Sequence, residues 1–85
     1  MTQTIDAKIR SVAHNIRKIR EFRNYTQEYL AMKLGISQNA YSKIELGYTR
    51  LTLERLIQIA QILGVDVVDL INENSEDLVR LHTTK

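Results

Sequence analysis

Three segments of this chain are flanked by the same kinds of residue. A Thr or Ser precedes each one, and its side-chain oxygen can accept a hydrogen bond from a first-turn N–H group of a helix. A Gly follows each one, and Gly readily takes the left-handed conformation that ends a helix. The segments run over residues 27–34, 38–46 and 53–63, flanked by Thr26 and Gly35, Ser37 and Gly47, and Thr52 and Gly64. This pattern predicts short helices joined by tight turns.

A longer amphipathic segment comes before these three, and shorter segments follow them. Its apolar residues recur every three or four positions, which is the stripe of one helix face: Ile5, Ile9, Val12, Ile16, Ile19 and Phe22. Asp66 can cap a fifth helix, and the tail can form one more turn behind Ser75. The one alternating stretch, 64–71, has no hairpin partner. The prediction is an all-α, compact five-helix bundle in a single domain over residues 1–85.

The amino-acid composition limits which class of protein this chain can belong to and which kinds of site it can contain. The chain has no Cys, which excludes disulfides and thiolate metal sites, and its two His residues are isolated in the sequence. No cofactor, no metal and no small-molecule ligand is therefore expected. The apolar runs are too short to span a bilayer, and the first residues lack the apolar core of a signal peptide. We expect a cytoplasmic protein with no membrane partner.

Charge is unevenly distributed along the chain, although the net charge is only +2. Residues 7–55 contain ten Lys or Arg against four acids, whereas residues 66–85 contain five acids against two bases. A basic first part and an acidic tail are typical of a protein that meets a polyanion. An ordinary solvated surface has the same charges, so charge alone leaves both interpretations open.

The segments 27–34 and 38–46 have the pattern of a helix-turn-helix. A short turn, "LGIS", separates them, and small Ala31 stands four residues before Gly35, where it lets two helices cross closely. The second helix of such a motif enters the major groove of DNA. Side chains of Gln and Asn can bond adenine there, and Lys can bond guanine. The candidates for reading base edges are Gln38, Asn39, Ser42 and Lys43, with a solvated polar face as the alternative.

At these residues the sequence resembles a known family. The stretch "TQEYLAMKLGISQNAYSKIELG" is similar to the helix-turn-helix of phage repressor/Cro-type (Xre family) transcriptional regulators, and the resemblance extends over residues 16–71. It implies a lambda repressor-like DNA-binding fold with the motif at 27–46 and short extensions at both ends. It also implies a sequence-specific regulator, most often a repressor, that binds a two-fold site on double-stranded DNA as a homodimer.

The resemblance implies roles for individual residues. Arg20 and Glu45 match a pair that commonly forms a buried ion pair, a structural role that explains Glu45 better than catalysis does. Helix starts, the loop after the motif and the basic surface supply the expected phosphate contacts: Arg23, Gln27, Ser37, Tyr48, Thr49 and Arg50. Two positions depart from the family pattern. Leu46 stands where Asn is favoured and cannot reach a phosphate, and Tyr41 replaces Ile or Val in the core.

The oligomer and the class of function leave alternatives. The preferred two-fold contact is a C-terminal apolar set, Val67, Leu70, Ile71, Leu78 and Leu81, with the N-terminal extension packed against the tail. In the alternative, these two regions only cover one another within a monomer. An antitoxin-like or anti-repressor interaction module, with secondary DNA binding, is the alternative function. The sequence contains no constellation of catalytic residues, so no enzyme is expected.

Overall fold

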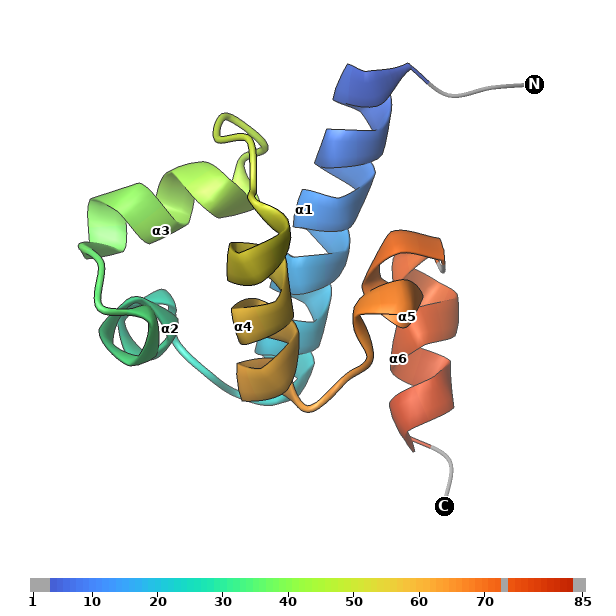
Figure 1. The fold of residues 1–85 in the computed structure, drawn as a ribbon. Coiled ribbons are helices and arrows are strands. Elements are labelled where there is room, and N and C mark those ends of the chain that lie inside the picture. Colours follow the sequence, from blue (N-terminus) through green and yellow to red (C-terminus); the bar gives the residue numbers. More distant parts are fainter. Residues whose placement is uncertain (1–3, 73, 84–85) are drawn as a thin grey trace.

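Six helices make up most of the computed structural model, which describes residues 4–72 and 74–83 (Figure 1). They are α1 (Ile5–Phe22), α2 (Gln27–Leu34), α3 (Gln38–Glu45), α4 (Leu53–Leu63), α5 (Val67–Asn72) and α6 (Ser75–Thr83). These described residues contain no strand, and the prediction of an all-α fold is confirmed. The expected number of five helices is wrong, because α6 is a full helix rather than one turn.

The helix ends follow the expected chemistry. The side chains of Thr26, Ser37 and Thr52 each accept a hydrogen bond from the backbone N–H three residues later, at 3.0 Å. Gly35 and Gly64 end α2 and α4 in the left-handed conformation, with φ of 72° and 73°. The predicted caps of these helices are confirmed, and the two glycines form the short turns from α2 to α3 and from α4 to α5.

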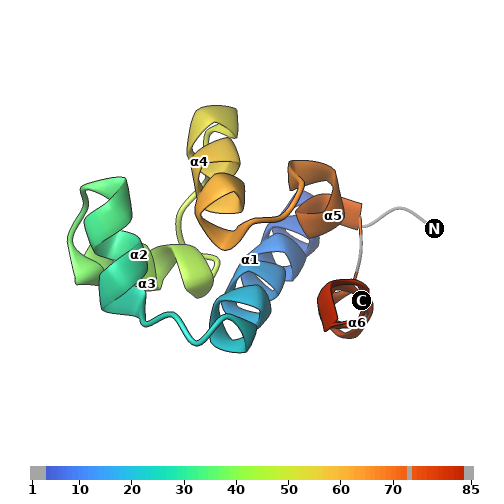
Figure 2. The same ribbon diagram turned by 90° about the horizontal axis from the view of Figure 1, so that it is seen from below.

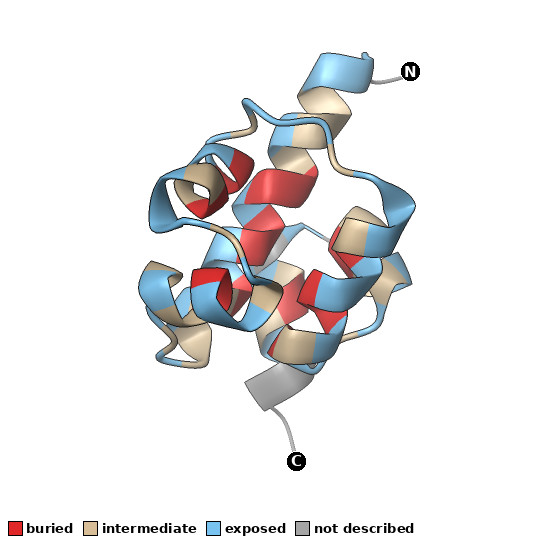
Figure 3. Ribbon diagram, turned by 60° about the vertical axis from the view of Figure 1, so that its left-hand side comes forward, coloured by how far each residue is buried: buried red, intermediate tan, exposed pale blue. Residues whose placement is uncertain are grey.

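Helix α1 lies between the two halves of the molecule. Figure 2 shows the α2–α3 pair on one side of α1 and the α5–α6 pair on the other, with α4 closing the gap. Ile16 and Ile19 of α1 and Leu30 of α2 are fully buried, and the buried residues of the other helices face the same interior (Figure 3). Leu53, at the start of α4, is 67% exposed and lies outside this core.

The tail packs on α1, and this changes the predicted dimer surface. Leu70 of α5 and Leu78 of α6 are fully buried in the monomer, so their place in a two-fold contact is wrong. Val67 and Ile71 are half-buried, and the side chain of Leu81 lies outside the described residues. The expected packing of the N-terminal region against the tail is present, since α1 contacts both α5 and α6.

Polar side chains of α1 hold α5 in place. Asn15 is buried, and its Nδ2 donates a hydrogen bond of 2.7 Å to the carbonyl oxygen of Leu70. The ammonium of Lys8 donates to the carbonyl oxygen of Ile71. Carbonyl groups at a helix C-terminus lack intrahelical partners and favour cations, so these two contacts stabilise the end of α5.

Candidate nucleic-acid interface

The turn between α2 and α3 is a close-packed junction. The N–H of Ile36 donates to the carbonyl oxygen of Ala31 at 3.0 Å, and the N–H of Gly35 donates to Met32 at 3.1 Å. Ala31 is 3% exposed, which leaves room for α3 to cross α2 closely. Two short helices joined in this way match the geometry that the sequence predicted for a helix-turn-helix.

Helix α3 has an inner and an outer side. Tyr41, Ile44 and Glu45 are buried, whereas Gln38, Asn39 and Lys43 are exposed and Ser42 is half-buried. At 3.6 residues per turn, the four candidate base-reading residues share one continuous arc with Leu46, which is 51% exposed. The structure therefore brings all four together on a single outward-facing surface, which we call the α3 outer arc: Gln38, Asn39, Ser42, Lys43 and Leu46.

The buried end of α3 is held by a polar network centred on the Glu45 carboxylate. Arg20 donates to it twice, from Nε to Oε2 at 2.6 Å and from Nη2 to Oε1 at 3.1 Å. The Tyr41 hydroxyl donates to Oε2 at 2.6 Å, and Gln27 Nε2 donates to Oε1 at 3.0 Å. Arg20 also donates to the carbonyl oxygen of Tyr25 at 2.9 Å. Helices α1, α2 and α3 thus share one charge-assisted cluster, in which Arg20, Tyr41 and Gln27 all donate to one acid.

The network shifts the protonation equilibria of its members. Burial raises the pKa of Glu45, but hydrogen bonds from Arg20, Tyr41 and Gln27 outweigh burial and hold that pKa below its ordinary value. Burial and the hydrogen bond to Glu45 raise the pKa of Tyr41 well above its usual range. The hydrogen bond with Glu45 raises the pKa of Arg20. The cluster is therefore an ionised carboxylate and guanidinium with a neutral phenol, a structural arrangement rather than an acid–base pair for catalysis.

Two residues expected at DNA phosphates have other contacts in the structure. Arg23 donates from Nε to the carbonyl oxygen of Leu63 at 2.9 Å, and from Nη2 to that of Gly64 at 3.4 Å. It therefore caps the C-terminus of α4, and a phosphate contact would have to use the N–H groups that this cap leaves over. The side-chain amide of Gln27 is engaged with Glu45, so only its remaining hydrogen-bonding groups are open to a phosphate.

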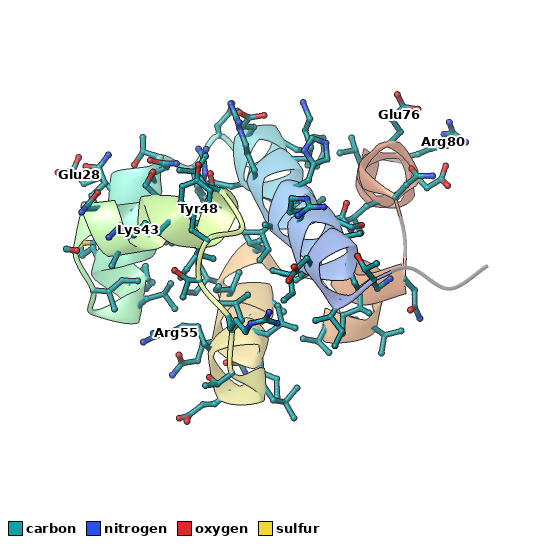
Figure 4. All side chains as sticks on the ribbon, turned by 90° about the horizontal axis from the view of Figure 1, so that it is seen from above. Glu28, Lys43, Tyr48, Arg55, Glu76 and Arg80 are labelled. Atoms are coloured by element: carbon teal, nitrogen blue, oxygen red, sulfur yellow. The ribbon has the colours of Figure 1, made fainter. Side chains whose placement is uncertain are left out.

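The loop after α3 contains the other expected phosphate contacts. Tyr48, Thr49 and Arg50 are exposed, with Tyr48 at 76%. Figure 4 shows Tyr48 and Lys43 at the α3 side of the molecule, and Glu76 and Arg80 at the opposite edge, on α6. Arg50 Nη2 lies 3.1 Å from Oδ1 of Asp6, an ion pair that sequence reasoning did not foresee.

The comparison with known families decides the identity of the motif. A helix-turn-helix family model (HTH_3) matches residues 16–70. The chain belongs to the Xre family of helix-turn-helix transcriptional regulators. The matched residues begin within α1 and end in α5, so they include the whole Glu45 network and the α3 outer arc.

Two relatives agree with membership of the Xre family, and two solved structures share the fold. The chain is 36% identical over 67 residues to the HTH-type regulator YqaE of Bacillus subtilis, covering 79% of this chain but 58% of YqaE. It is 34% identical over 65 residues to the HTH-type regulator y4dJ of Sinorhizobium fredii, covering 76% and 84%. The fold resembles the clp gene regulator ClgR of Corynebacterium glutamicum (TM-score 0.75, 21% identity, 89% and 81% covered). It also resembles the hypothetical transcription factor NHTF from Neisseria (TM-score 0.73, 26% identity, 93% and 89% covered).

Arg55 lies beside α3, at a position that the sequence analysis did not single out. A hollow of about 460 Å³ separates α3 from the start of α4, and Asn39, Lys43 and Arg55 line it. Arg55 Nη1 donates to the carbonyl oxygen of Leu34 at 3.3 Å, which directs the guanidinium toward the helix-turn-helix. In the sequence, its position in the first turn of the helix after Thr52 is the one feature that could have indicated that Arg55 lies beside α3.

Within residues 4–72 and 74–83, no helix is both long and apolar enough to cross a bilayer. The same residues form no cluster of three or more His, Asp or Glu that could hold a metal ion.

Proposed function

We propose that the protein is a sequence-specific double-stranded DNA-binding regulator, acting as a repressor, which binds a two-fold operator as a dimer with α3 in the major groove. The α3 outer arc is the observation that carries this proposal. Its donors and acceptors are solvent-exposed, while the opposite side of the helix is buried against α1 and α2 through the Glu45 network. A helix held rigidly on one side with free polar groups on the other suits readout of base edges.

Contacts to the DNA backbone would come from groups around the arc. Ser37 caps α3 and Gln27 begins α2, so both helix N-termini present N–H groups that suit phosphate oxygens. Tyr48, Thr49 and Arg50 extend the same surface along the loop, and Arg55 extends it on α4. Leu46 supplies an apolar side chain where a thymine methyl group can be met.

The dimer contact is proposed on the side chains of α5 that remain exposed. Val68 is 58% exposed, and the half-buried Val67 and Ile71 are its neighbours on this short helix. One recognition helix contacts too few base pairs to select a single site in a genome. A second copy would double the number of base pairs that are read. In this arrangement the two α3 helices would reach half-sites about 34 Å apart.

A gel-shift experiment tests the proposed function. The full chain is mixed with DNA fragments from around its own gene, and with fragments from elsewhere in the same genome as competitors. A discrete complex that resists excess competitor supports a sequence-specific regulator. Binding to every fragment with one affinity, or to none, argues against it.

The alternative, an interaction module whose DNA binding is secondary, receives less support. Such a module would need a docking surface, and the apolar residues of the acidic tail are one candidate. Leu78 of that tail is fully buried against the rest of the monomer. Loss of any discrete complex in the gel-shift, with retained folding, would favour this alternative.

A further inference from the structure

The first two turns of α1 lie beside the loop that follows α3. Both are at the upper end of the molecule in Figure 1, as is α3 itself. A Cβ on Gly47 would lie 3.2 Å from Cγ of Arg10 and 3.9 Å from Cβ of Ala13, so this contact is close-packed. These turns precede residue 16, where the family match begins, and no role in the proposed interface has been assigned to them.

A small polar hollow of about 170 Å³ opens at this junction. Residues of α1 form one wall and residues of the loop form the other: Asp6, Ile9, Arg10, Gly47, Tyr48 and Arg50. Two arginines and a tyrosine, whose side chains end in guanidinium groups and a phenol hydroxyl, thus border a space beside the proposed DNA surface. These are the donors that bind phosphate oxygens in protein–DNA complexes.

The one carboxylate in the hollow is paired with one of the two guanidinium groups. Asp6 Oδ1 lies 3.1 Å from Arg50 Nη2, and both side chains are 70% exposed. An ion pair this exposed is weakly held and easily exchanged for another anion. Arg10 has no ion-pair partner within the described part of the chain, so its charge is open to an external anion.

We propose that this hollow is a binding site for one phosphate of the DNA backbone. Arg10 and Arg50 bind the phosphate from two sides, and the phosphate displaces Asp6 from Arg50. The inference rests on the proposed function and extends the interface beyond residues 16–70. In the free protein Asp6 neutralises Arg50. DNA binds Arg50 only by displacing Asp6, so Asp6 lowers the affinity for DNA.

The first test measures the contribution of Arg10. Binding of the full chain to a short random-sequence duplex is followed by fluorescence anisotropy between about 50 and about 200 mM salt. Arg10→Gln should weaken binding and make the slope of log affinity against log salt shallower by about 0.9 for each protomer bound. Arg10→Lys retains the charge and should keep the slope, which separates loss of charge from loss of packing on Gly47.

Two variants of α6 serve as charge-matched controls. Arg80→Gln removes one positive charge at the far edge of the molecule, away from Lys43 and Tyr48 (Figure 4), and should leave the slope unchanged. Glu76→Gln likewise removes one negative charge there. A thermal melt of every variant checks that the fold is retained.

The second test concerns the exchange between Asp6 and phosphate. Asp6→Asn should tighten binding to the random duplex severalfold at low salt, and by more than Glu76→Gln does. The difference should vanish when both changes are made in an Arg50→Gln background, because no guanidinium then remains to be released.

The outcomes separate the inference from the function on which it rests. Equal slopes for Arg10→Gln and Arg80→Gln overturn the phosphate site. Equal affinities for Asp6→Asn and Glu76→Gln overturn the exchange. A wild-type chain that shows no salt-dependent binding to any duplex overturns the proposed function itself.

Discussion

Nε of Arg20 on α1 lies 2.6 Å from Oε2 of Glu45 on α3, and only 2% of the Glu45 side chain is exposed. This pair joins the helix that spans the molecule to the helix that bears the α3 outer arc. Because the carboxylate also accepts from Tyr41 and Gln27, its removal leaves donors of three residues without their acceptor at once. The orientation of α3 and the stability of the domain should therefore depend on one residue.

Glu45→Ala should lower the free energy of unfolding by about 3–5 kcal/mol, because it strands the Arg20 guanidinium in a largely buried position. That is a large share of the stability of a small domain, which is about 5–15 kcal/mol. Urea denaturation measures the change. The exposed Glu28→Ala is the control and should cost less than about 1 kcal/mol. If Glu45→Ala unfolds at the same urea concentration as the wild type, the pair does not stabilise the fold.

Replacing both partners should be milder than removing one. In Arg20→Met with Glu45→Leu, no charge is left buried without a partner, so the double variant should be more stable than Glu45→Ala alone. The Tyr41 hydroxyl still loses its acceptor, and a third change, Tyr41→Phe, should recover part of the remaining loss. The same denaturation series compares the three variants.

Stability should fall in acid through Glu45. The pKa of this group is held below its ordinary value of 4.5 in the folded protein, so the unfolded chain takes up the proton first as the pH falls. The contribution is fully present above pH 4.5 and is lost as the pH drops through the lower, folded-state pKa. The difference in unfolding free energy between the wild type and Glu45→Gln should shrink over that range. A difference that does not change with pH would show that Glu45 has the same pKa in both states.

The α3 outer arc should discriminate between DNA sequences. Once an operator is identified, Gln38→Ala and Lys43→Ala should each weaken operator binding by about 1–3 kcal/mol, and weaken random-sequence binding much less. Asn39→Ala is tested beside them, because this residue also borders the hollow near Arg55. Gln61→Ala, exposed near the end of α4, is the control and should change neither affinity. Equal losses on both DNAs would assign these side chains to the backbone rather than to bases.

Two glycines provide a matched pair for testing how closely α1 approaches the loop. Gly35 and Gly47 have similar φ values of 72° and 77°, but a Cβ on Gly35 meets nothing within 4 Å, whereas one on Gly47 lies 3.2 Å from Arg10 Cγ. Gly35→Ala should cost about 1–2 kcal/mol from backbone strain alone. Gly47→Ala should cost more, and the excess should vanish in an Arg10→Ala background. Equal costs for the two single changes would mean that Arg10 moves aside without a measurable loss of stability.

The dimer proposal is tested on α5. Val68→Asp should convert a dimer into a monomer in sedimentation at micromolar concentration, because a buried, unpaired carboxylate would oppose the contact. Met32→Asp, at an equally exposed apolar position of α2, should leave the dimer unchanged. A shortened chain that lacks α6 is a poor test, since it would expose the core around Leu78. If the wild-type chain itself sediments as a monomer, any dimer can form only on DNA.

Local features of the sequence were sufficient to predict most of the helices. Thr26, Ser37 and Thr52 act on N–H groups three residues away, and Gly35 and Gly64 act on the turn in which they stand. Such effects depend on neighbours in the chain. The outer and inner sides of α3 were predictable for the same reason, because the helical period sets which residues share a side.

The features that the sequence did not predict depend on contacts between residues far apart in the chain. The length of α6 depends on the burial of Leu78 against residues far away in the sequence, which no local pattern reveals. Arg23 reaches a carbonyl group 40 residues later, and Arg50 pairs with an acid 44 residues earlier. The flexible side chains of Arg can serve several partners, and only the tertiary fold decides among them.

The separation of α3 into an inner and an outer side has a consequence for how such a protein can change its target. Tyr41, Ile44 and Glu45 carry the packing, and none of them belongs to the arc that faces outward. If α3 reads DNA as proposed, exchanging Gln38, Asn39 or Lys43 would alter what the helix recognises without a repacking cost. Recognition in this domain is free to diverge while the architecture beneath it stays the same.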